Sequence, residues 1–296
     1  MASLLPGVAV ELVVVETEGD RRVDVPLESL GGQGVFAKEV QTAVLRGDAD
    51  AAVHSAKDLP ASADLTVADL VIAAYPERAD PRDLLVGGTV GGLAAGDVVA
   101  TGSPRRRVQL ARARPDLAFT GLRGNLSTRL ARAGQGGVAA VVVAKAAVDR
   151  LGWRPGAGVA TEVLEPSVMV PQVGQGALAV ECRRDDGATR EVLAHLDRPE
   201  VRRALTAERA FLAELGGGCL LPVGAHARDA GPGDGPGGLV LVGLLADDDG
   251  REVHRHEATG ADPERLGREV ARYLLGAVGA VGDGPTGDGV GAPAGP

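Results

Sequence analysis

The stretch Asp97–Ala113, DVVATGSPRRRVQLARA, decides the fold class of this 296-residue chain. Its apolar start predicts a short strand over Asp97–Thr101, and Ser103 followed by Pro104 predicts the N-cap and first turn of a helix. The run Val138–Ala144, VAAVVVA, is apolar throughout, as expected for a strand in a parallel sheet that is covered on both faces. Strands separated by helices predict an α/β fold with mainly parallel sheets.

Working outward from this stretch, the pattern predicts further elements on both sides. In the first half we expect strands at Val8–Glu16 and Asp50–His54 and helices at Gly34–Arg46 and Leu126–Ala133. After Asp197 the pattern changes to that of a small α+β unit, predicted as a helix through Glu214, strands Leu239–Leu245 and Glu252–Gly260, and a helix Pro263–Leu275. The segment Gly282–Pro296 is rich in Gly and Pro, which predicts disorder.

The composition excludes several classes of function. The chain is 45% hydrophobic and 24% charged, which is typical of a globular protein, but only 2% aromatic. Few aromatic side chains and a net charge of -9 argue against a nucleic-acid partner. Two cysteines suit a reducing cytoplasm and exclude a disulfide scaffold. The longest apolar run is too short to span a membrane, and the N-terminus lacks the basic start of a signal peptide.

Charge is distributed unevenly along the chain. Between Thr101 and Arg150 there are nine Arg and one Lys against Asp116 and Asp149, a local net charge of +8. The remaining residues hold 21 basic and 38 acidic side chains, a net charge of -17. A basic segment within an acidic body predicts a concave site for a small anion.

Two motifs carry side chains suited to anion chemistry. His54-Ser55-Ala56-Lys57-Asp58 ends a predicted strand, the edge at which open α/β sheets bind ligands. Ser103 to Arg107 places a hydroxyl and three guanidinium groups at a helix N-terminus, which favours anions. Arg123-Gly124-Asn125 with Arg129 repeats the device. The alternatives are an ordinary turn for the first motif and solvated helix arginines for the second, and no phosphate-binding P-loop pattern is present.

The two cysteines differ in their surroundings. Cys182 lies in the strand-like run Ala177–Cys182, where a buried, inert thiol is the expectation. Cys219 follows three glycines, which is an unusual place for a purely structural thiol, although an inert role stays open from the residues alone. Neither has a partner at metal-ligand spacing, so we expect no metal.

Seven motifs occur in an order that resembles the porphobilinogen deaminase (hydroxymethylbilane synthase) family. They are GGQGVFAKEVQTAVL, DAAVHSAKDLP, ERADPRDLLV, ATGSPRRRVQL, LRGNLSTRL, PQVGQGALAVECR and AERAFLAELGGGCLLPVGAHA. The resemblance runs from about Pro6 to about Leu275. It implies two domains similar to type II periplasmic binding proteins and a small α+β C-terminal domain. The implied ranges are domain 1 at 1–75 with 173–194, domain 2 at 76–172, domain 3 at 195–280, and a disordered tail at 281–296.

The resemblance also implies an activity and a cofactor. Members polymerise four porphobilinogen molecules head to tail into hydroxymethylbilane and release ammonia, in tetrapyrrole and haem biosynthesis. Their primer is a dipyrromethane held by a thioether, which by motif match is attached through Cys219 here. Porphobilinogen carries an acetate and a propionate, so the basic segment would supply counter-charges. Deamination passes through an electron-poor azafulvenium, which calls for a nearby carboxylate.

Residue by residue, the resemblance assigns the following roles. Asp58 matches the catalytic aspartate, which would accept pyrrole N–H hydrogen bonds and assist proton transfers. Lys57, Ser103, Arg105 and Arg106 match residues that hold the carboxylates of the cofactor. The positions that match the substrate and chain-growth region are Arg123, Arg129, Arg150, Gln175 and Phe36.

The chain departs from the family pattern in three places. The family begins with a strand, an Arg-x-Ser-x-Leu motif and a helix, all before the strand equivalent to Val8–Glu16, and a misassigned start codon is the expected explanation. Without that strand we expect unpaired backbone groups and a gap in the core. Ser29 and Gln33 stand where some members have lysines, and Glu18 replaces a commonly basic residue.

The expected partner is porphobilinogen alone, with no nucleic acid and no membrane, for a monomer in the cytoplasm. Two alternatives to the enzyme remain. One is a truncated, non-catalytic relative, and the other is a two-lobed anion-binding protein, which the absent signal peptide and the Cys219 loop oppose.

Overall fold

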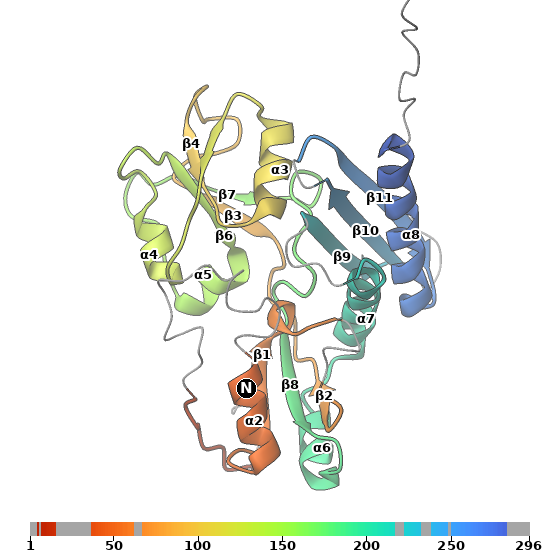
Figure 1. Cartoon of the computed structure of the whole chain (residues 1–296). Helices are drawn as coiled ribbons and strands as arrows, with labels where there is room; N and C mark the ends of the chain where they lie inside the picture. The colour runs from red at the N-terminus through yellow and green to blue at the C-terminus, as the bar shows by residue number, and fades with distance from the viewer. Residues whose placement is uncertain are drawn as a thin grey trace, which may run out of the picture.

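We describe the chain from a computed structural model, which places residues 5, 7–15, 37–61, 67–216, 222–231, 238–247 and 250–282. Three β-sheets organise this part of the chain, and each packs with helices of its own (Figure 1). The second sheet lies at the upper left of that view, the third to its right and the first below them. The α/β class expected from the sequence is confirmed. Its strands are less uniformly parallel than expected, because among the described strand pairs only β4–β5 and β4–β6 are parallel.

The first sheet has the order β1-β8-β2. Its centre is β8 (Leu178–Arg183), and β1 (Ala51–Ser55) and β2 (Leu70–Ala74) both pair with it antiparallel. Helix α2 (Lys38–Arg46) packs on β1 and β8, and α6 (Gly187–Ala194) packs on β2 and β8. Because β8 lies between strands from the first quarter of the chain, every strand pair of this sheet joins residues more than 100 positions apart.

The second sheet is mixed and has five strands in the order β5-β4-β6-β3-β7. The first two pairs are parallel, and β3 is antiparallel to both β6 and β7. Its strands are β3 (Asp83–Val86), β4 (Val98–Ala100), β5 (Ala118–Thr120), β6 (Ala140–Ala144) and β7 (Thr161–Leu164).

Helices cover this sheet on two faces and bury β6 completely. Val141 and Val143 face a cluster shared with Leu130 and Val148, while Ala140 and Val142 face one shared with Leu110. The apolar run in the sequence thus reflects a strand with no solvent-facing side. The helices are α3 (Pro104–Ala113), α4 (Leu126–Ala131) and α5 (Lys145–Leu151).

The third sheet is an antiparallel meander, β9 (Val223–Asp229), β10 (Leu239–Ala246) and β11 (Val253–Gly260). It packs against α7 (Pro199–Glu214) and α8 (Pro263–Gly282), which also pack against each other. The predicted order of a helix, strands and a helix is therefore confirmed, and β9 is an addition that the sequence reading missed.

The close packing in this unit depends on a glycine in β10. A Cβ at Gly243 would lie 2.7 Å from Phe211 on α7 and 2.7 Å from Val270 on α8. Only a residue without a side chain lets the Phe211 ring lie against the sheet at this position. Phe211, one of three phenylalanines in the chain, is fully buried there.

One predicted strand is absent. Residues 8–15 form no strand, and Leu12 and Val14 are 86% and 82% exposed. Alternating apolar residues favour an extended chain, but a strand also needs a neighbour for its backbone hydrogen bonds. No strand of the described sheets pairs with this segment.

Other predicted features lie outside the described residues. These are Glu18, Ser29, Gln33, Phe36, Cys219 and the part of the predicted tail after residue 282. Helix α8 runs to Gly282, seven residues past the predicted end at Leu275 and into the start of the predicted tail. The three sheets fall within the three predicted domain ranges, and the domain boundaries themselves stay a prediction.

Candidate functional site

Lys57 and Asp58 lie where the first sheet meets the second. They belong to the short 3-10 turn η3 (Ala56–Asp58), which directly follows β1 and is tied to the segment before β8 by the Ala56 N–H, donating to the Ala177 carbonyl at 3.0 Å. Gly174 has a φ of +74°, and a Cβ there would lie 2.9 Å from the backbone nitrogen of Lys57. Gly174 of the VGQG motif thus allows its backbone to meet that of η3 at Lys57.

The surroundings shift the pKa values of both side chains. Burial lowers the pKa of Lys57, an effect that the Asp58 charge opposes and Arg106 reinforces. Asp58 keeps solvent-accessible surface, although protein atoms crowd around it closely enough that burial raises the pKa of its carboxyl against the charges of Lys57 and His54. Both shifts move the pKa values toward neutral pH, which suits groups that transfer protons.

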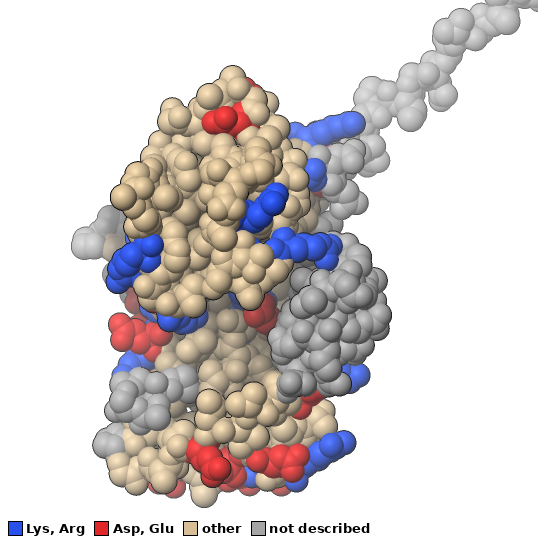
Figure 2. Space-filling view, turned by 90° about the vertical axis from the view of Figure 1, so that its left-hand side faces the viewer, with Lys and Arg blue, Asp and Glu red and all other residues tan. Residues whose placement is uncertain are grey.

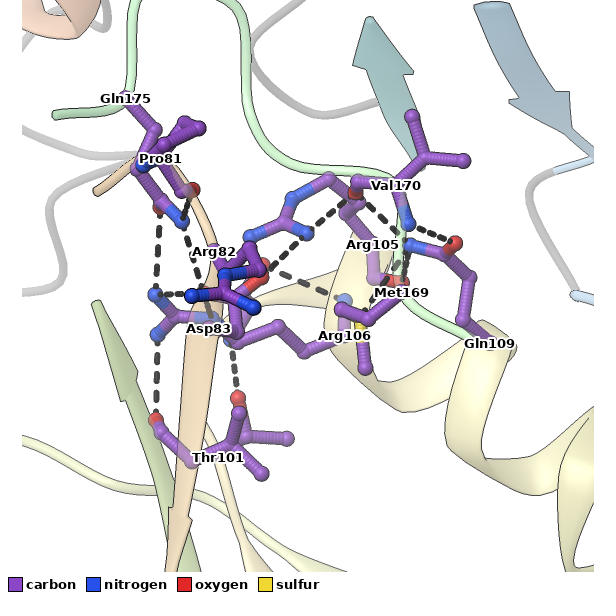
Figure 3. A network of polar contacts seen from close by, with 12 residues as sticks. Pro81, Arg82, Asp83, Thr101, Arg105, Arg106, Gln109, Met169, Val170 and Gln175 are labelled. Carbon is purple, nitrogen blue, oxygen red and sulfur yellow. Dashed lines mark hydrogen bonds and ion pairs between the residues drawn. The ribbon is translucent and has the colours of Figure 1, made fainter. Parts of the chain in front are cut away.

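A buried ion cluster lies on the second-sheet side of Lys57 (Figure 3). Asp83, the first residue of β3, is fully buried. Its Oδ2 accepts from Arg105 Nη1 at 2.8 Å, and its Oδ1 accepts from Arg106 Nε at 3.0 Å and pairs with Nη2 at 2.8 Å. Gln175 Nε2 also donates to Oδ1 at 3.0 Å. These four residues are called the Asp83 cluster below.

Arg105 keeps donors for which the described residues supply no acceptor. Its Nη1 donates to Asp83 and to the Val170 carbonyl, whereas its Nε and Nη2 are buried without a hydrogen-bond partner. By contrast, Arg106 also donates to the Val142 carbonyl at 3.1 Å. Since buried donors are nearly always satisfied, the free edge of Arg105 indicates an acceptor supplied from outside the described chain.

Two of the three remaining predicted arginines, Arg129 and Arg150, lie near this cluster. Arg129, on α4, lies near enough for its charge to lower the pKa of Arg106, after burial as the main cause. Arg129 Nε donates to the Gly124 carbonyl at 2.7 Å, and Arg150 Nη2 donates to the Gly176 carbonyl at 2.8 Å. Arg123 is exposed. Figure 2 shows Lys and Arg side chains along the lower margin of the upper part of the molecule, where it meets the part below.

Two predicted ligand-contacting residues have other contacts in the structure. Gln175 is fully buried, with its amide nitrogen also donating to the Pro81 carbonyl at 2.7 Å, so it supports the cluster and does not line an open surface. The Ser103 hydroxyl caps α3 by accepting from the Arg106 N–H at 3.4 Å. The capping role was predicted, and it uses an acceptor of the hydroxyl while leaving its proton to donate.

Beneath Asp58, His54 takes part in a packed polar group. It is buried on β1, and its Nε2 lies 3.1 Å from Glu181 Oε2 on β8. Gln41 on α2 donates to the same carboxylate oxygen at 2.8 Å. Glu181 joins the helix to the sheet, which agrees with the expectation from the pattern that His54 is a packed strand residue.

The sequence reading missed a second buried ion cluster. Glu208 on α7 is fully buried and pairs with Arg78 at 2.7 and 3.1 Å. It also accepts from the Gly174 N–H at 2.8 Å and the Ala227 N–H at 2.9 Å, and His226 Nδ1 lies 3.5 Å away. This Glu208 cluster ties the α7 unit to the connections between the other two sheets.

Asp83 was also missed, although the sequence held a signal for it. In RADPRDLLV, a carboxylate opens an otherwise apolar strand, and charged residues at buried strand positions need a partner. A cavity of about 600 Å³ lies elsewhere, between β2 and α7, where Tyr75, Arg202 and Arg209 line it and none of the predicted site residues does.

Two kinds of feature are absent from the described ranges. No helix placed by the structure is long and apolar enough to cross a membrane. Within the same residues, no group of three or more His, Cys, Asp or Glu side chains is arranged to hold a metal ion.

Comparison with known proteins places this geometry in a family. Residues 1–191 match the model described as porphobilinogen deaminase, dipyromethane cofactor binding domain, and residues 203–276 match the model of the C-terminal domain. The chain belongs to the porphobilinogen deaminase family. Relatives called porphobilinogen deaminase include one from Syntrophobacter fumaroxidans, 42% identical over 93% of this chain and 87% of that protein. Another, from Acidothermus cellulolyticus, is 45% identical over 91% of this chain and 81% of that protein.

Among solved structures, an ABC transporter from Parabacteroides distasonis is 16% identical and covers 60% of this chain and 61% of its own. Its TM-score is 0.36, a level of likeness that carries no argument about this chain.

The residues present fit the cofactor named by the matched domain model. A dipyrromethane built from porphobilinogen carries acetate and propionate groups. The free Nε and Nη2 edge of Arg105 has the fork geometry that binds a carboxylate in bidentate fashion. Lys57 beside it adds a second cation. Among the described residues, Arg105 and Lys57 therefore have the chemistry to hold a carboxylate of the cofactor.

Proposed function

We propose that this chain is a transferase that polymerises four porphobilinogen molecules head to tail into hydroxymethylbilane with release of ammonia. The observation that carries the proposal is the position of Lys57. It adjoins Asp58 in η3 and lies close enough to the Asp83 cluster for their charges to interact, and Arg105 of that cluster holds donors that no described residue accepts. Family membership supports the same reaction class.

Asp58 is the proposed catalytic residue. Its carboxylate stays accessible at the end of η3, where it can accept hydrogen bonds from a pyrrole N–H and stabilise the positive charge that develops as ammonia leaves. Its raised pKa lets it hold a proton for the departing amine and take one back from the newly joined ring. The positive charge of Lys57 opposes the effect of burial and so limits the rise in the pKa of that carboxyl.

The cationic residues hold carboxylates. Arg105, Lys57 and Ser103 bind the cofactor acids, and Arg106 contributes its positive charge from within the Asp83 cluster. Arg129, Arg150 and Arg123 bind the acids of incoming substrate. Dipyrromethane, when bound through Cys219, supplies the primer to which the first substrate ring is joined. Gln175 supports the Asp83 cluster from within by donating to Asp83.

The further parts of the proposal concern the whole protein. We propose that it works as a monomer in the cytoplasm, with porphobilinogen as its partner and neither nucleic acid nor membrane. The net charge of -9 and the 2% aromatic content support the absence of a polyanionic partner.

Intact mass under denaturing conditions tests the proposal. The purified chain, incubated with porphobilinogen, is expected to gain two porphobilinogen units less two ammonia molecules. Cys219→Ser should lose that gain, and Cys182→Ala should keep it because Cys182 is buried in β8. An unmodified wild-type mass would contradict the enzyme and favour a non-catalytic anion-binding relative, and a gain retained by Cys219→Ser would contradict the attachment site.

A further inference from the structure

We propose that Asp83 is a positioning residue, which orients Arg105 and Arg106 and leaves the cluster with one uncompensated positive charge for a single ligand carboxylate. The inference rests on the proposed function and adds to it a residue that the family motifs did not single out. Three features of the Asp83 cluster carry it.

The first feature is that Asp83 divides its two oxygens between the two guanidinium groups. Oδ2 serves Arg105 and Oδ1 serves Arg106 and Gln175. Asp83 is held on both sides, since its strand position pairs with Ala144 and with Leu164. A carboxylate fixed in a central strand therefore sets the planes of both arginines, which extend from a different element, α3.

The second feature is the choice of which donors stay free. Asp83 and the Val170 carbonyl share Nη1 of Arg105, with the carbonyl at 2.6 Å. That leaves Nε and Nη2, two neighbouring N–H groups that point the same way and match the two oxygens of a carboxylate. Arg106, by contrast, donates to Asp83, to the Val142 carbonyl and to Gln175. The cluster thus presents one bidentate edge and not two.

The third feature is charge. Two guanidinium groups, 3% and 7% exposed, surround one carboxylate that is fully buried. Burial by itself would raise the pKa of Asp83, but Arg105 and Arg106 outweigh it and bring the pKa to about 2. The ionised cluster holds a net charge of +1 away from water, where an unpaired charge is costly. One bound monocarboxylate arm neutralises it.

The test uses Asp83→Asn, which keeps the shape of the side chain and removes its charge. Wild type and variant are incubated with a porphobilinogen dilution series, and the folded monomer is isolated before its mass is measured. We expect the concentration that loads half of the folded chains to rise at least tenfold in Asp83→Asn. Added inorganic phosphate should inhibit loading more strongly in the variant, because its cluster holds a charge of +2.

Asp80→Asn is the matched control. Asp80 lies three residues earlier, pairs with Arg82 and touches no member of the cluster, so its variant should load like wild type. Gln175→Met removes the hydrogen bond to Asp83 without changing charge and should raise the half-loading concentration less than Asp83→Asn does. If Asp83→Asn yields no folded monomer, the half-loading concentration of Gln175→Met tests the inference in its place.

Each outcome is decisive. A purely structural role for Asp83 would lower the yield of folded chain but leave its loading curve and phosphate sensitivity unchanged, and that result overturns the inference. Unchanged loading in Gln175→Met overturns it as well. A wild-type chain that gains no mass contradicts the proposed function, and with it the inference, and is distinguished from the other failures by the wild-type arm alone.

Discussion

Two fully buried carboxylates lie on either side of Gln175, and they differ in how completely their surroundings match them. Glu208 meets one guanidinium, two backbone N–H groups and, at 3.5 Å, His226 Nδ1, so with histidine counted as neutral its charge is balanced by Arg78. Asp83 meets two guanidinium groups, one of which keeps two buried donors without a partner. Gln175 touches both clusters, through its side chain on Asp83 and its carbonyl on Arg78.

The comparison separates a structural ion cluster from a ligand site. The pKa values do not make the distinction, because both carboxylates are depressed to about 2. What differs is the balance of charge and donors. With histidine counted as neutral, the net charge around Glu208 is zero, whereas the Asp83 cluster keeps one positive charge and an Arg105 edge that no described residue accepts from. A buried cluster that is left incomplete by the protein indicates a group that arrives from outside.

The largest expected effect is on stability, at the balanced cluster. Glu208→Gln leaves Arg78 buried without a counter-charge and should lower the free energy of unfolding by about 3 to 5 kcal/mol. Adding Arg78→Met removes the unpaired charge while the amide still accepts from the Gly174 N–H. The double variant should show a coupling free energy of about 1 to 3 kcal/mol in urea unfolding.

Cofactor loading is the second measurement on these variants, and it separates a loss of stability from a loss of ligand binding. Folded Glu208→Gln is expected to load like wild type, because the Glu208 cluster has no surplus charge to offer a ligand. Strictly additive destabilisation by Arg78→Met and Glu208→Gln would remove the basis for calling this cluster a balanced pair.

Acid should affect the two clusters alike. The ordinary pKa values of Asp and Glu, 3.8 and 4.5, fall to about 2 in the folded chain. The native state therefore binds fewer protons than the unfolded chain, and each carboxylate adds stability above about pH 4.5 that is lost as the pH falls toward 2. The contribution is on the order of 2 to 3 kcal/mol for each.

Urea unfolding between pH 6 and pH 3 measures this dependence. Glu208→Gln and Asp83→Asn should each lose stability less steeply with falling pH than wild type does. A variant that retains the full wild-type slope would show that its carboxylate already carries a proton in the folded chain, which would contradict the pairing described for that cluster.

Much of this architecture could be predicted from the sequence because its elements are strongly patterned. The Ser-Pro start of α3 and the apolar run of β6 encode local structure directly. The segment at residues 8–15 shows the limit, since an extended pattern does not reveal whether a neighbouring strand is there to pair with it. Strand direction was also out of reach, because β3 and β6 pair antiparallel through residues 50 or more positions apart.

For the site, too, only part of the arrangement could be predicted from the sequence. The family motifs assigned Lys57, Arg105 and Arg106 to one ligand. In the structure their charges act on one another, and their roles toward that ligand stay predictions. They did not reveal that Gln175 is buried, nor that Asp83 sets the arginines, because burial and pairing depend on segments that meet only in the folded chain. The isolated carboxylate opening the DLLV strand was the available signal.

Steady-state consumption of porphobilinogen by Asp58→Asn is the measurement that tests the account most directly, with Asp48→Asn, an exposed site in the turn after α2, as its control. Because general acid–base catalysis contributes roughly 10²- to 10⁴-fold, we expect Asp58→Asn to lose at least about 100-fold in turnover while it remains folded, and Asp48→Asn to match wild type. Turnover by folded Asp58→Asn within a few-fold of wild type would contradict the assignment of the chemistry to this end of β1.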